Sequence, residues 1–102
     1  MKGTRLRYAH YMAPRWIRTK DHSHPPFTAK DEDDWLLLSG EFVVGRVFRE
    51  TTGPNAGCVL WTLSGLHGLS VGVGSAESIE TGQSELVAAW REWQAWAGVR
   101  DA

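Results

Sequence analysis

The residues whose types could do chemistry do not form a recognised catalytic signature in this chain. Cys58 and His67 could act as nucleophile and base only if the fold brought the thiol and the imidazole together. Because neither residue stands in a catalytic sequence pattern, we interpret Cys58 as a small residue of the core or of a strand edge. A single cysteine also excludes an intramolecular disulfide and a cysteine-based zinc site.

Two further groups of residues could act as metal ligands. His22 and His24, together with His10, stand beside Pro25 and Pro26, where no helix or hairpin would fix their spacing. The acidic run 31–34 lacks the alternate spacing and the glycine of a calcium-binding loop. We therefore interpret the histidines as solvated loop residues and the acidic run as a solvated linker.

The glycine-rich stretch Gly65–Gly74 could hold a phosphate on free backbone N–H groups ahead of a helix. It lacks the Gly-Lys-Ser/Thr ending of a P-loop and does not fit the G-x-G-x-x-G pattern. The alternation of Leu69, Val71 and Val73 leaves two alternatives, a long flexible crossover or a weak fourth strand. We predict no catalytic, metal-binding or cofactor-binding residues, and we expect that the protein is not an enzyme.

One long segment, 78–99, has a clear helical period. Its apolar residues recur every three or four positions and so share one face of an α-helix; they are Ile79, Gly82, Leu86, Trp90, Trp93 and Ala97. Ser78 is the expected N-cap, and Gly98 is the expected C-terminal stop because glycine tolerates φ > 0. The tryptophans of this face each offer about 150–250 Å² to bury, so the helix must pack on a sheet.

That sheet is predicted from three short segments rich in β-branched and aromatic residues, 35–38, 42–48 and 58–64. The connection Ser39–Glu41 is short enough for a tight hairpin. The expected fold is α+β: a three-stranded antiparallel meander packed against one C-terminal helix, with an irregular N-terminal arm. We divide the chain into a basic arm with an acidic linker, 1–34, and a β-β-β-α domain, 35–102.

Charge is divided unevenly along the 102 residues, although the net charge is only −1. Residues 1–30 contain seven Lys and Arg against one acid, whereas residues 31–102 contain four against eleven. In the arm, cations that could neutralise phosphates alternate with rings that could stack on bases. The candidate contact residues are Arg5, Arg7, Tyr8, Tyr11, Arg15, Trp16, Arg18 and Lys20, with Arg46 and Arg49 on the second strand and Trp96 on the helix.

The acidic remainder of the chain would repel nucleic acid and could neutralise the arm internally. We therefore expect a small accessory or regulatory protein that binds another macromolecule, a protein in the first place. The alternative is a nucleic-acid-binding module that uses the basic arm and the open face of the sheet. A second copy of the chain is a further candidate partner. The chain has no apolar run long enough to span a membrane and no secretory signal, so the expected location is cytoplasmic.

The order of motifs resembles a group of short uncharacterised proteobacterial proteins. The resemblance covers about residues 35–99 and rests on a Gly-Arg-Val strand, a Trp-x-Leu strand and an Ala-Trp-x-x-Trp helix; the residues are Gly45-Arg46-Val47, Trp61, Leu63, Ala89-Trp90 and Trp93. It implies a compact β-β-β-α domain and no particular activity. The same element order is similar to AP2-type domains, to the arm-binding domains of phage integrases and to small antitoxin domains, and such a likeness does not fix function.

Overall fold

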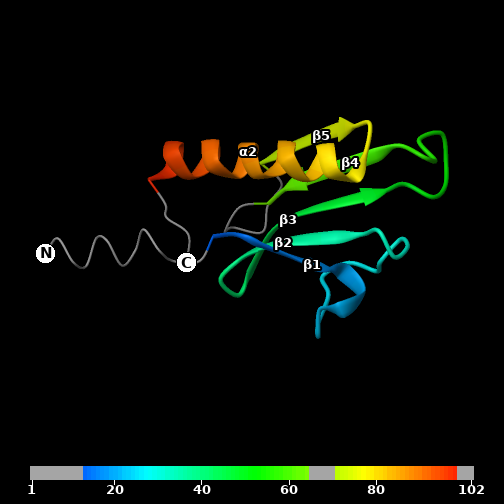
Figure 1. Ribbon diagram of the computed structural model, residues 1–102, viewed down its shortest axis with the longest axis horizontal. Helices are drawn as coiled ribbons and strands as arrows, with labels where there is room; N and C mark the ends of the chain where they lie inside the picture. Colours follow the sequence, from blue (N-terminus) through cyan, green and yellow to red (C-terminus); the bar gives the residue numbers. More distant parts are fainter. Residues whose placement is uncertain (1–12, 65–70, 99–102) are drawn as a thin grey trace, which may run out of the picture.

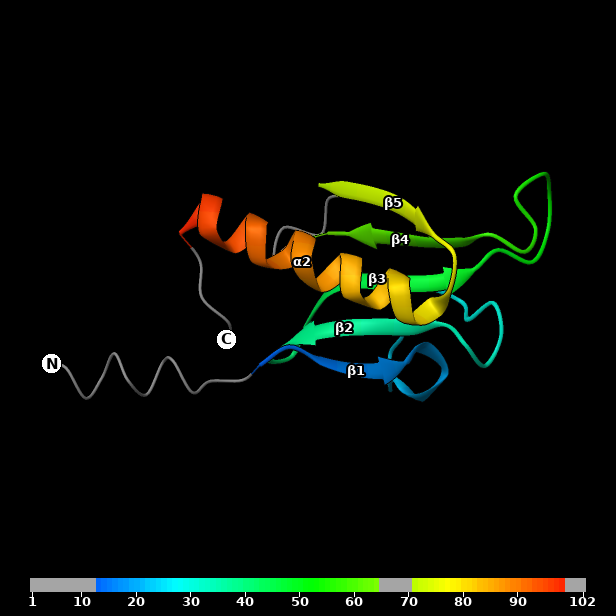
Figure 2. The ribbon, with the colours of Figure 1, turned by 45° about the horizontal axis from the view of Figure 1, so that its top comes forward.

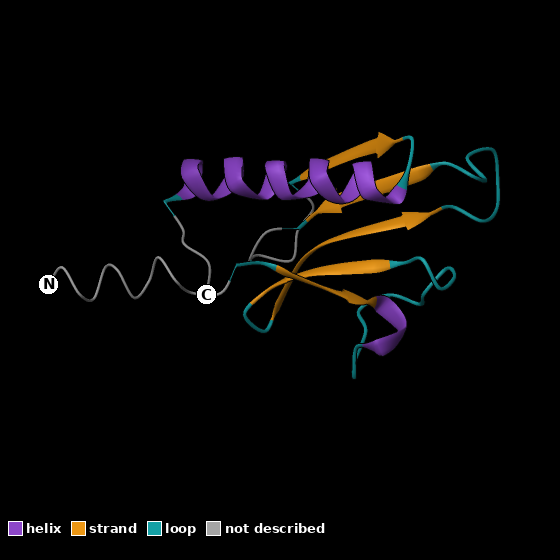
Figure 3. Cartoon of the chain, in the orientation of Figure 1, coloured by secondary structure: helices purple, strands orange, loops and turns teal. Residues whose placement is uncertain are grey.

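The protein is an antiparallel sheet of five strands with one long helix lying across one of its faces (Figures 1 and 3). The computed structural model describes residues 13–64 and 71–98. The strands follow the chain order β1-β2-β3-β4-β5, and each pairs with the next in antiparallel fashion. The elements are β1 (Arg15–Arg18), β2 (Trp35–Ser39), β3 (Phe42–Arg49), β4 (Val59–Leu63), β5 (Gly72–Ala76) and α2 (Ile79–Ala97), with a short 3-10 helix η1 (Thr19–Asp21).

The predicted three-stranded meander is therefore wrong, although the α+β class and the three central strands are right. The first additional strand, β1, lies in the region that we expected to be an irregular arm. It pairs with β2 in the register Arg15↔Leu38 to Arg18↔Trp35. Four residues followed by a turn are too short to show a period, so only the hydrogen bonds from β2 make them a strand.

The second additional strand, β5, lies in the glycine-rich stretch for which a weak fourth strand was one of two alternatives. It pairs with β4 from Leu63↔Gly72 to Val59↔Ala76. Glycine is depleted in strands, and the sequence signal is correspondingly weak. Residues 65–70 of that stretch lie outside the described residues.

The core lies between the helix and the sheet (Figure 2), where α2 contacts β3, β4 and β5. Its buried side chains form one cluster, which consists of Leu37, Val44, Val47, Val59, Leu63, Ile79, Leu86 and Trp90. Each large apolar side chain that is fully buried contributes about 1.5–3 kcal/mol. Gly82 is also buried, and a Cβ there would lie 3.0 Å from Val47 and 3.2 Å from Val59, so the glycine lets the helix approach the sheet.

Both predicted caps of the helix are confirmed. The Ser78 hydroxyl accepts a hydrogen bond from the backbone N–H of Thr81 at 3.1 Å, and Glu80 lies in the first turn, where the helix dipole favours an acid. At the other end Gly98 has φ 70°, in the left-handed region. The local sequence is thus sufficient to define where this helix begins and ends.

The opposite face of the sheet is covered in part by the β1–β2 connection, residues 19–34. Residues that pair directly across strands share a face, so Leu36, Arg46 and Thr62 all lie on the face away from α2. The backbone N–H of Thr19 donates to the carbonyl of Asp34 at 2.8 Å, which closes the two ends of this connection. The connection therefore belongs to the folded domain, and it carries the acidic run 31–34.

Candidate functional site

The candidate residues of the basic arm are only partly within the described residues. Arg5, Arg7, Tyr8 and Tyr11 lie outside them, while Arg15 is exposed on β1. Trp16 is half-buried and packs against the core cluster on the helix side of the sheet. It also lines a shallow depression with residues of one flank of α2, which are Glu80, Gln83, Ser84 and Val87.

The acidic run 31–34, which we interpreted as a solvated linker, is instead the partner of these basic side chains. Glu32 accepts from Lys20 Nζ at 2.8 Å and from Arg18 Nη1 at 3.4 Å. Its pKa is lowered by the hydrogen bond from Lys20. Asp33 lies 3.8 Å from Arg49. The predicted internal neutralisation of charge is thus present among the described residues.

Among the predicted contact residues that the structure describes, Arg46 is the most buried. Its Nε donates to Asp34 Oδ1 at 2.9 Å, and its Nη2 donates to Asp34 Oδ2 at 2.6 Å. The guanidinium lies over two rings, with centroid distances of 4.5 Å to Phe27 and 4.2 Å to Phe48. A planar, delocalised cation suits both the bidentate carboxylate and the aromatic faces. The residue is therefore positioned to hold the β1–β2 connection on the sheet.

Asp34 completes this buried pair with two further donors. Its Oδ1 accepts from the Thr19 hydroxyl at 2.7 Å, and its Oδ2 accepts from the backbone N–H of Lys30 at 2.7 Å. Burial raises the pKa of Asp34, but the hydrogen bonds from Arg46, Lys30 and Thr19 and the charge of Arg46 outweigh it, so the pKa lies below its ordinary 3.8. Asp34 is a saturated structural carboxylate.

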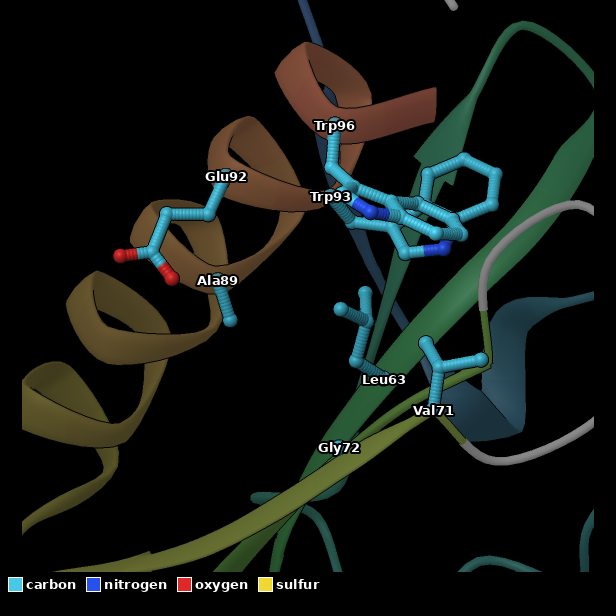
Figure 4. Close-up of a pocket in the computed structure, with 7 residues that line it drawn as sticks. All are labelled: Leu63, Val71, Gly72, Ala89, Glu92, Trp93 and Trp96. Atoms are coloured by element: carbon cyan, nitrogen blue, oxygen red, sulfur yellow. The ribbon is translucent and has the colours of Figure 1, made fainter.

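A different part of the molecule offers an open apolar surface. The C-terminal half of α2 and the beginning of β5 enclose a groove of about 350 Å³, which we call the α2–β5 groove; its residues are Leu63, Val71, Gly72, Ala89, Glu92, Trp93 and Trp96. Figure 4 shows the indoles of Trp93 and Trp96 extending from the helix over Leu63 and Val71, while the carboxylate of Glu92 is turned away from the two indoles. Trp96 is 82% exposed, so its large apolar surface is available for contact.

The other face of β5 has a second shallow depression of about 370 Å³. It is mostly apolar and is lined by Phe48, Leu60, Trp61, Thr62, Val73, Gly74 and Ser75. Val73 is 70% exposed there. Apolar surface therefore flanks β5 on both sides. Trp96 was predicted from the sequence as a contact residue, whereas Val71 and Val73 were not predicted as surface residues, although their alternation is visible in the sequence.

Of the remaining chemical candidates, His22, His24 and Cys58 lie within the described residues. His22 Nδ1 accepts the backbone N–H of His24 at 3.0 Å, and Cys58 is exposed. His10 and His67 lie outside the described residues. Within 13–64 and 71–98 there is no group of three or more His, Cys, Asp or Glu side chains that could hold a metal ion. In the same part of the chain no helix has the length and apolar character needed to cross a membrane.

Comparison with known proteins adds no relative: no family model, no curated protein and no solved structure matches the chain.

Proposed function

We propose that this protein is a small non-enzymatic binding module that recognises another protein at the α2–β5 groove, in an accessory or regulatory role. The observation that carries the proposal is Trp96, an indole left 82% exposed beside an apolar groove. Tryptophan is enriched among the residues that dominate binding energy in protein interfaces. A ring that is 82% exposed buries little apolar area on folding, which favours a role in contact.

The buried ionisable pair supports the non-enzymatic part of the proposal. The side chains of Arg46 and Asp34 form hydrogen bonds with each other, with the Thr19 hydroxyl and with the backbone of residues 28 and 30. A general acid or base must reach a substrate, whereas this carboxylate is enclosed by its own donors. Its arrangement is that of a pair that fixes a loop.

The same ion pairs count against the alternative, a nucleic-acid-binding module. Arg18, Lys20, Arg46 and Arg49 each pair with an acid of the run 31–34. Each cation would have to exchange an intramolecular carboxylate for a phosphate, which reduces the gain from releasing counterions. The face of the sheet that would meet the duplex is also partly covered by the connection that contains Phe27.

The proposal can be tested with a random peptide library displayed on phage and selected on the immobilised full chain. Selected peptides are then titrated against the wild type, the Trp96→Ala variant and the Phe42→Ala variant. Phe42 is the matched control, because it is an exposed aromatic residue outside the groove. We expect Trp96→Ala to weaken binding at least tenfold, as for an interface hot spot. We expect Phe42→Ala to leave binding unchanged.

Two results would overturn this proposal. One is a selection that enriches no peptide above background. The other is equal affinity of the enriched peptides for the wild type and Trp96→Ala. DNA binding that weakens steeply with salt and survives Trp96→Ala would favour the nucleic-acid alternative instead.

A further inference from the structure

The outer edge of β5 lacks the features that usually protect an edge strand. Among the described residues, β5 ends the strand order and pairs only with β4. Edge strands are normally guarded by charged residues, proline or a bulge, because their free N–H and C=O groups can pair with another chain. Gly72–Ala76 contains no charge and no proline. The opposite edge, β1, is guarded by Arg15 and Arg18.

The flank of the helix on the β5 side is acidic. Ala89 and Trp96 line the α2–β5 groove, and Glu85 and Glu92 share their side of the helix at spacings of three and four residues. Glu85 Oε1 accepts from Trp61 Nε1 of β4 at 3.0 Å, so this flank of α2 faces the side of the sheet where β4 and β5 lie. Residues 71–98 contain four glutamates and one basic residue. A strand that adds to β5 should therefore be basic.

The chain itself contains a segment with these properties. Residues 1–12 carry Lys2, Arg5 and Arg7 and no acid. From Arg5 to Tyr11 the side chains alternate, so that in a strand Arg5 and Arg7 would share one face while Leu6 and Tyr8 shared the other. Charge and alternation both match the edge of β5 and the two surfaces beside it.

The number of residues between this segment and β1 determines whether the segment can reach β5 of its own chain or only β5 of a second copy. The position beyond β5 is five strand spacings from β1, which is about 24 Å. Tyr11 precedes Arg15 by four residues, and an extended chain of that length reaches only about 14 Å. Arg5–Tyr11 therefore cannot pair with β5 of its own chain, but it can pair with β5 of another.

We propose that residues 5–11 of one copy add to the outer edge of β5 of a second copy as a sixth strand. In this arrangement Arg5 and Arg7 face the flank of Glu85 and Glu92, and Leu6 and Tyr8 lie beside Val73 on the other face. The surface that residues 5–11 contribute differs from the edge of β5 that receives them, so the contact is heterologous. Assembly therefore grows with concentration. This inference rests on the proposed protein-binding role and names a second copy as its partner.

Static light scattering of the full chain over a range of concentrations and salt tests the proposal. We expect a mean mass that rises with concentration and falls with salt. The Arg5→Glu/Arg7→Glu variant should remain a monomer throughout. Glu92→Lys should weaken assembly a few-fold, while Glu80→Lys, the same charge change on the other flank of α2, should not. An excess of the synthetic peptide 1–12 should dissociate the assembly.

A peptide 1–12 with alternate backbone amides N-methylated separates strand pairing from simple charge attraction. It keeps every side chain but loses the N–H donors of one edge, so it should fail to dissociate the assembly. Equal activity of the two peptides would overturn the proposal. So would a full chain that is monomeric at all concentrations, or an assembly that is unchanged in Arg5→Glu/Arg7→Glu.

Failure of this proposal can be distinguished from failure of the proposed function. If selected library peptides bind in a manner that depends on Trp96 while the chain stays monomeric, the groove binds protein but the arm is not its ligand. If assembly persists in Arg5→Glu/Arg7→Glu and is lost in Val73→Lys, two β5 edges pair directly with each other. In either case residues 5–11 are not the sixth strand.

Discussion

Arg46 and Asp34 are joined by two hydrogen bonds in a buried site, with Nε 2.9 Å from Oδ1 and Nη2 2.6 Å from Oδ2. The pair links β3 to the end of the β1–β2 connection, and the Thr19 hydroxyl joins it from the other end of that connection. Among the described residues no buried side-chain polar atom is left without a partner. The network therefore satisfies its own polar groups while it ties the β1–β2 connection, residues 19–34, to the sheet.

Removal of one member of this pair should be strongly destabilising. Asp34→Ala leaves the Arg46 guanidinium buried without its carboxylate, and we expect the free energy of unfolding to fall by about 3–5 kcal/mol. Urea denaturation followed by tryptophan fluorescence measures this. As a control, the double variant Asp34→Leu/Arg46→Leu should lose less than Asp34→Ala, since it leaves no charge unpaired. A change within about 0.5 kcal/mol, typical of surface positions, would contradict the assignment.

The same pair should make stability depend on pH in the acid range. The pKa of Asp34 is lower in the folded protein than its ordinary 3.8, because the donors around it favour the carboxylate. Its contribution is fully present above pH about 3.8 and is lost as the pH falls towards the folded pKa. The urea midpoint of the wild type should therefore fall below pH 4 more steeply than that of Asp34→Asn. Parallel curves for the two proteins would show that Asp34 does not titrate in this way.

Two glycines of β5 should respond differently to the same substitution. A Cβ at Gly74 would clash with the ring of Trp61, whereas a Cβ at Gly72 would meet nothing closer than 3.7 Å. Gly74→Ala should displace the indole and lower stability by about 1–3 kcal/mol, as overpacking does. Gly72→Ala should be neutral or slightly stabilising, because alanine loses less backbone entropy on folding. Denaturation curves of both variants test the contrast, and equal effects would refute it.

Substitution of two tryptophans of α2 should distinguish a residue needed for folding from one needed for binding. Trp90 is fully buried and stacks on Trp93 at a centroid distance of 5.4 Å, so Trp90→Ala should cost about 3–5 kcal/mol. Trp96→Ala removes an exposed ring and should change stability by no more than about 0.5 kcal/mol. Thermal denaturation compares the two. A large loss for Trp96→Ala would mean that its ring serves the fold, and the binding role assigned to it would then lose its basis.

Sequence patterns predicted the elements whose signal is local. The helix was predictable because its apolar residues keep the helical period and because Ser78 and Gly98 can cap it without help from the rest of the chain. The strands β2, β3 and β4 were predictable from runs of β-branched and aromatic residues. The uneven distribution of charge was also visible in the sequence. It led to the prediction that acidic residues could neutralise basic residues within the chain.

Only the tertiary structure decided the two edges of the sheet and the partners of the charges. β1 and β5 are strands because β2 and β4 present hydrogen-bonding groups to them, and neither a four-residue segment nor a glycine-rich one carries that information locally. The pairing of Asp34 with Arg46 joins the end of the β1–β2 connection to β3 over twelve sequence positions, so no helical or hairpin spacing predicts it.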